Sequence, residues 1–198
     1  QPIQSTPLVT APRIIQVIEK PLDPKMTLEK VVEEHHEVVR TLLRAPKIRR
    51  SYQEYVRHAS NEYKVDPNII HAMIDIESKG NPKARSAMGA LSIGLMQITP
   101  QTAEEIGLPR RKMTDPKYSI HYGTKYFAML LNKYHNNKIL ALAAYNLGPN
   151  KVDRILKRNG LDAKNVTQEN FGPILNRITR NYITTILTTA TALDTTQR

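Results

Sequence analysis

Hydrophobic residues recur every three or four positions along most of the chain, which is the period of an α-helix. The clearest case is the segment 67–79, where Ile69, Ile70, Met73 and Ile74 share one helical face. The alternating pattern of a half-buried strand is nearly absent. We therefore predict an all-α fold, with helices at residues 27–44, 51–64, 67–79, 101–106, 119–135, 138–146, 149–158 and 172–193.

Glycine, proline and asparagine separate these helices. Asp66 and Pro67 suit the N-cap and the first residue of a helix. Pro46 is expected to end the first helix, because the residue before a proline avoids the helical conformation. Gly80-Asn81-Pro82 marks a loop after the helix 67–79.

The first 46 residues differ in pattern from the rest. Residues 1–25 contain five prolines and predict an extended segment, which the amphipathic helix 27–44 follows. The chain begins at Gln1 without the pattern of a leader peptide, so we expect a mature form whose export signal lies outside it. We predict two parts: an N-terminal arm and helix at 1–46, and the main domain at 47–198.

Composition and charge restrict the classes of function. The 198 residues include no cysteine, which excludes disulfide scaffolds, cysteine-ligated metals and thiol nucleophiles. No apolar run is long enough to cross a membrane. The net charge of +11 lies entirely in residues 47–198, so an anionic partner is expected: a nucleic acid, an acidic membrane surface or an acidic polysaccharide. The alternative is a soluble basic protein with no such partner.

Glu77 is the most informative single residue. It follows Met73 by four positions and Ile74 by three, so its carboxyl ends the apolar stripe of the helix 67–79. Partial burial raises the pKa of a carboxyl, as a general acid near neutral pH requires. The alternative is a last-turn glutamate whose carboxyl reaches solvent. Asp75 shares a face with His71 and Lys79, which predicts a solvated salt-bridge position.

Several motifs follow Glu77 in a recognisable order. They are Glu77-Ser78, Ser86, Gly94-Leu95-Met96-Gln97, Ala143-Ala144-Tyr145-Asn146-Leu147-Gly148-Pro149 and Thr179-Arg180-Asn181-Tyr182. In this order they resemble the catalytic domain of the soluble lytic transglycosylases, over about residues 50–190. That family has a lysozyme-like fold, related to goose lysozyme, and cleaves bacterial peptidoglycan.

The resemblance implies roles for individual residues. Glu77 matches the single catalytic glutamate, and Ser86 a serine that contacts substrate. Met96 and Gln97 match a pair that lines the groove. Tyr145 and Asn146 match the groove wall, and Tyr182 a tyrosine that orients the catalytic carboxyl. Two departures are visible: two extra residues separate Gly89-Ala90 from Gly94, and Leu147 stands where alanine is commoner.

The resemblance also implies a reaction and a location. The β-1,4 bond between N-acetylmuramic acid and N-acetylglucosamine would be cleaved without water, leaving a 1,6-anhydromuramoyl end, in the periplasm or cell envelope. Neither metal nor cofactor is expected. The partner hypothesis is peptidoglycan, with residues 1–46 docking on a cell-envelope or secretion assembly.

Three alternatives remain from the sequence. A muramidase would hydrolyse the same bond, and a glycan-binding or assembly protein would keep the fold without turnover. A nucleic-acid binder is disfavoured because the basic residues form neither a reading helix nor a platform flanked by aromatic residues.

Overall fold

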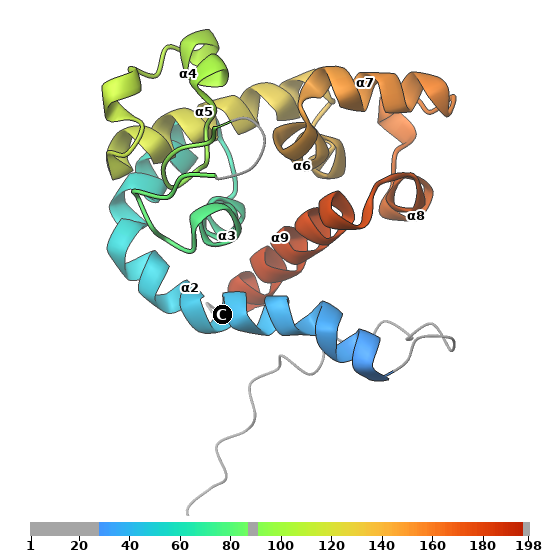
Figure 1. Cartoon of the computed structure of the whole chain (residues 1–198), viewed down its shortest axis with the longest axis horizontal. Helices are drawn as coiled ribbons and strands as arrows, with labels where there is room; N and C mark the ends of the chain where they lie inside the picture. The colour runs from blue at the N-terminus through green and yellow to red at the C-terminus, as the bar shows by residue number, and fades with distance from the viewer. Residues whose placement is uncertain (1–27, 87–90, 196–198) are drawn as a thin grey trace, which may run out of the picture.

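Helices account for nearly all regular structure in residues 28–86 and 91–195, the parts of the chain that the computed structural model describes (Figure 1). Within these ranges no strand forms, and the backbone pairs only at isolated bridges that join Ile93 to Arg85 and to Ile98. The longer helices are α2 (Leu28–Tyr63), α3 (Pro67–Ser78), α4 (Pro100–Ile106), α5 (Pro116–Lys133), α6 (Lys138–Leu147), α7 (Pro149–Arg158), α8 (Gln168–Phe171) and α9 (Arg177–Thr195). Short 3-10 turns lie at Arg110–Lys112, Ala163–Asn165 and Gly172–Ile174.

Helix α3 lies at the centre of the packing. It contacts α9 and α2, and Figure 1 shows it between them. Ile70, Met73 and Ile74 are completely buried, as the apolar stripe predicts. The prediction of a solvated face at Asp75 and His71 is wrong, since both are buried. Packing against α2 and α9 covers α3 on more than one face, so its polar residues are enclosed as well.

Helix α2 corrects the prediction that Pro46 ends the first helix. The helix runs unbroken from Leu28 to Tyr63 and curves around the base of the molecule (Figure 1). A proline inside a helix removes one hydrogen bond and favours a kink. Ala45 and Ile48 flank it and are buried in the core, so packing holds the helical turns on both sides.

The N-terminal predictions are tested only in part. The backbone of the predicted helix 27–44 is helical from Leu28, but the side chains of 28–44 lie outside the described residues, as does the proline-rich segment 1–25. The division at residues 46 and 47 stays a prediction, and α2 crosses it. The docking of residues 1–46 also stays a prediction.

Capping residues fix the helices that carry the candidate site. The Asp66 side chain accepts from the Asn68 N–H (2.8 Å) at the start of α3, and Lys79 ends that helix in a left-handed conformation. Glu77 therefore lies in the last turn. Between α6 and α7 the backbone breaks at Gly148, whose φ of 84° favours glycine. None of the helices in the described residues has the length and apolar character of a membrane-spanning segment.

Candidate active site

The carboxyl of Glu77 meets the hydroxyl of Tyr182. The tyrosine O–H donates to Oε1 of Glu77 at 2.6 Å, which joins the end of α3 to the first half of α9 across 105 residues of sequence. Tyr182 itself is buried, whereas Glu77 is half-buried. A short hydrogen bond to a buried ring restricts the orientation of the carboxyl.

Burial controls the protonation of Glu77. It raises the pKa of this carboxyl to about 7, against the opposing effect of the Tyr182 hydrogen bond, which favours the ionised form. Among the described residues, no other acidic side chain contributes to the shift. With its pKa raised into the neutral range, Glu77 can both give and take a proton near neutral pH.

Two tyrosines lie close to this carboxyl: the buried Tyr182, which donates to it, and the half-buried Tyr145, whose hydroxyl donates elsewhere. Burial, followed by the nearby charge of Glu77, raises the pKa of Tyr182 and of Tyr145 well above the usual value for a phenol. Both hydroxyls thus keep their protons at any physiological pH. Tyr145 donates to the Met96 carbonyl at 2.8 Å. This bond ties the end of α6 to the loop 91–98.

Close packing shapes the loop that carries Met96 and Gln97. Met96 is completely buried against Gly123 of α5, where a Cβ would lie 2.5 Å from the Met96 Cβ. The Met96 N–H donates to Ser119 Oγ at 3.2 Å. Its side chain therefore supports the loop from the core. Gln97 has a left-handed backbone (φ 46°), and its amide nitrogen donates to the carbonyl of Gly94 at 2.8 Å.

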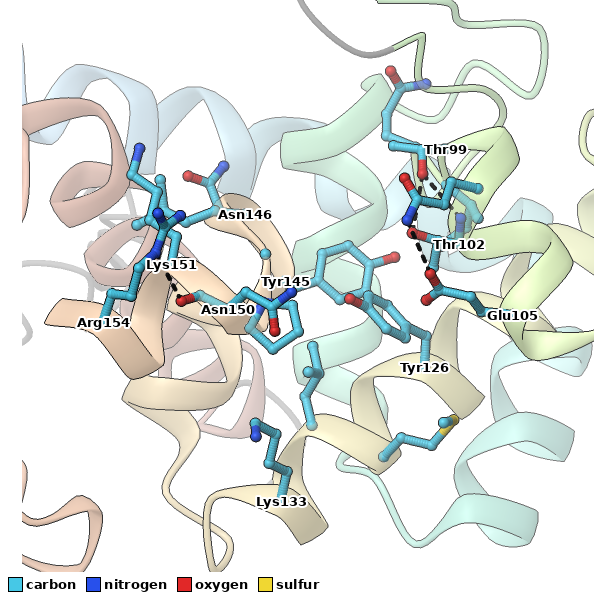
Figure 2. Close-up of a pocket in the computed structure, with 18 residues that line it drawn as sticks. Thr99, Thr102, Glu105, Tyr126, Lys133, Tyr145, Asn146, Asn150, Lys151 and Arg154 are labelled. Atoms are coloured by element: carbon cyan, nitrogen blue, oxygen red, sulfur yellow. Dashed lines mark hydrogen bonds between the residues drawn. The ribbon is translucent and has the colours of Figure 1, made fainter. Parts of the chain in front are cut away.

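Gln97 and Tyr145 are among the residues that line a cleft of about 800 Å³. Figure 2 shows Tyr126 and Tyr145 between its two walls. One wall comes from α4 and the residue before it, and the other from the junction of α6 and α7. Residues of α5 complete the lining. The polar residues on the walls are Thr99, Gln101, Thr102, Glu105, Asn146, Asn150, Lys151 and Arg154.

The predicted site residues fall into distinct positions. Tyr182 contacts Glu77, and Tyr145 lies near enough for the Glu77 charge to raise its pKa. Gln97, Tyr145 and Asn146 line the cleft. Glu77 is not among the residues that line the cleft. Tyr145 does line the cleft, and it lies close enough to Glu77 for the charge of that carboxyl to raise its pKa.

Asn146 and Ser86 have their own local contacts. The Asn146 side-chain carbonyl accepts from the Thr179 hydroxyl at 2.9 Å, which anchors the first turn of α9. Ser86 is half-buried, and its N–H donates to the Ser92 carbonyl at 3.0 Å. Ser86 lies just before residues 87–90, which are outside the described ranges, and its contact with substrate stays a prediction.

Sequence reasoning did not identify the residues that α5 contributes to the cleft. Tyr126, Met129, Leu130 and Lys133 recur at spacings of three and four, so they share one helical face. This spacing can be seen in the sequence, but it fits a core-facing stripe equally well, so it does not identify a cleft. Glu105 of α4 also lies on the cleft wall.

Comparison with known protein families identifies the family of this chain. The family described as transglycosylase SLT domain matches residues 54–168, more than half of the chain. The chain belongs to the transglycosylase SLT domain family. This confirms the family resemblance and the all-α, lysozyme-like fold, and it supports an enzyme of the lytic transglycosylase class.

Solved structures of lytic transglycosylases are similar to this SLT domain. The 70 kDa soluble lytic transglycosylase from Escherichia coli is 27% identical, with a TM-score of 0.62 over 74% of this chain and 24% of that one. A complex of the 70 kDa enzyme with bulgecin A has the same identity and coverage and a TM-score of 0.63.

A third structure is a lytic transglycosylase from Pseudomonas aeruginosa, an inactive mutant with glutamate replaced by glutamine. It is 24% identical, covers the same shares of both chains and has a TM-score of 0.61, which shows the fold. The SLT domain described above therefore spans about a quarter of the length of each of these proteins.

Proposed function

We propose that this SLT domain cleaves the β-1,4 bond between N-acetylmuramic acid and N-acetylglucosamine in peptidoglycan and leaves a 1,6-anhydromuramoyl end. The family supports peptidoglycan as the substrate. The observation that carries the proposal is the Glu77–Tyr182 pair: one half-buried carboxyl with its pKa raised to about 7, oriented by a buried phenol.

No acidic group among the described side chains acts on Glu77 as a second carboxylate, which favours this chemistry over hydrolysis. Retaining and inverting glycosidases place two carboxyl groups about 5–9.5 Å apart, one of them to act as nucleophile or to activate water. A second charge so near would raise the pKa of Glu77, and no acidic group among the described side chains does so. A reaction that needs one carboxyl fits this site best.

The proposed reaction uses Glu77 twice. In the first step the protonated carboxyl gives its proton to the glycosidic oxygen as the bond from that oxygen to C1 of the muramoyl unit breaks. In the second step the resulting carboxylate takes the proton of the C6 hydroxyl as the C6 oxygen bonds to C1. The proton returns to Glu77 and no water is consumed. A pKa near 7 serves both steps.

The test is digestion of purified peptidoglycan in heavy-oxygen water, followed by chromatography and mass spectrometry of the products. We expect muramoyl ends that are lighter than hydrolysed ends by one water and that contain no heavy oxygen. Reducing ends that carry heavy oxygen would instead identify a muramidase. Binding to the glycan without any product would identify a glycan-binding or assembly protein.

The proposed substrate also determines where the domain acts. Peptidoglycan lies in the cell envelope, so we propose an exported protein that works in the periplasm or envelope. The positive charge of residues 47–198 supports this location, because it attracts the domain to an anionic wall.

A further inference from the structure

One wall of the cleft concentrates positive charge. Lys151 and Arg154 lie on it together with Asn146, opposite Thr102 and Glu105 (Figure 2). Lys133 of α5 adds a third cation to the lining, and Glu105 is the only acidic residue in the lining of this cleft. The cleft therefore carries a net formal charge of +2, and its two walls differ in sign.

The cations differ in how far they are already neutralised. Lys133 forms an ion pair with Asp153 at 3.0 Å. The Arg154 Nε–H donates to the Asn150 carbonyl at 3.3 Å. The terminal nitrogens of the guanidinium have no partner among the described residues. The Lys151 ammonium also has no ion-pair or hydrogen-bond partner within the described ranges. Lys151 and Arg154 are thus the cations available to a ligand.

We infer that Lys151 and Arg154 bind carboxylates carried by the muramoyl units of the glycan strand. The inference rests on the proposed function and extends it to the groups attached to the sugars. A guanidinium with free terminal nitrogens matches the two oxygens of a carboxylate, and a lysine beside it adds a second charge. A neutral glycan offers no such group.

Two carboxylate sources exist on peptidoglycan. One is the peptide stem, and the other is the lactyl group of a muramoyl unit from which the stem has been removed. Both present the same chemistry, so three ligands separate them: glycan fragments that bear stems, fragments stripped of stems by an amidase, and neutral chito-oligosaccharides of equal length.

Affinities are measured by calorimetry in the Glu77→Gln background, in which no ligand is consumed. The test variant is Lys151→Gln/Arg154→Gln. The matched control is Lys157→Gln/Arg158→Gln, which removes the same charge from exposed residues of α7 outside the cleft lining. We expect the test variant to bind stem-bearing fragments about tenfold more weakly and chito-oligosaccharides equally well. The control should change each affinity by less than about twofold.

The stripped fragments locate the carboxylate. If only the stem-bearing fragments lose affinity, the peptide stem supplies the carboxylate. If only the stripped fragments lose affinity, the freed lactyl group supplies it. If both lose affinity and the chito-oligosaccharides do not, the site accepts either carboxylate. Equal losses for all three ligands, or no loss for any, would overturn the inference. Product analysis of the wild-type domain is independent of these affinities, so it shows separately whether the proposed reaction fails.

Discussion

Glu77→Gln is expected to lower the rate of glycan cleavage by about a thousandfold or more. Glutamine keeps the size of the side chain and can still accept from the Tyr182 hydroxyl, which lies 2.6 Å from Oε1. It has no acidic proton to give to the glycosidic oxygen and no carboxylate to take one back. Both proposed steps lose their proton carrier, so the effect is larger than that of losing one contact. Release of soluble fragments from purified peptidoglycan measures the rate.

Two controls separate chemistry from folding in this experiment. Glu104→Gln removes an exposed carboxylate of α4 that is outside the cleft lining, and it should leave the rate within about twofold of the wild type. Circular dichroism and thermal unfolding should show that Glu77→Gln folds normally. A folded Glu77→Gln protein that retains a tenth or more of the wild-type rate would remove Glu77 from the mechanism.

Gly94→Ala is expected to destabilise the domain by at least about 3 kcal/mol. Gly94 has a φ of 84°, and a Cβ there would overlap the backbone carbonyl oxygen of Met113 and lie 2.9 Å from Ser119 Oγ. Neither neighbour is the flexible end of a long side chain, so the loop itself must move. That loop carries Met96 and Gln97, and Gln97 lines the cleft. We therefore expect loss of cleavage as well as of stability.

Gly107→Ala isolates the contribution of the close contact. Gly107 ends α4 with a φ of 80°, nearly the same backbone conformation, but a Cβ there would meet nothing within 4 Å. Only the left-handed strain remains, about 1 kcal/mol. Chemical denaturation of both variants gives the two free energies of unfolding. If the two variants lost the same free energy of unfolding, the close contacts that a Cβ makes at position 94 would not contribute to the loss.

The local features of the site could be predicted from the sequence. The apolar stripe from Ile69 to Ile74 defined the buried face of α3, and helical spacing put Glu77 at its end. The ordered motifs related Glu77 to Tyr182, residues that no local pattern could bring together across 105 positions. Helix period and family pattern were sufficient for these elements.

Features that depend on tertiary packing could not be predicted in this way. Asp75 and His71 have the spacing of a solvated pair, but packing of α2 and α9 buries them. Pro46 is a helix breaker by local rules, and buried neighbours on both sides keep α2 continuous. Arg154 lines the cleft because the backbone breaks at Gly148 and α7 then forms part of one wall. The residues next to Arg154 in the sequence do not indicate that it lies there.

The most direct test of the account is the pKa of the Glu77 carboxyl. It is measured by NMR titration of protein with carbon-labelled glutamate, with Glu77→Gln assigning the resonance. The predicted midpoint is about 7, and cleavage should fall as the pH rises through it, because the proton donor is lost. Tyr182→Phe removes the hydrogen bond that favours the ionised form, so it should move the midpoint higher. A midpoint near the ordinary value of 4.5 would contradict the proposed proton donor.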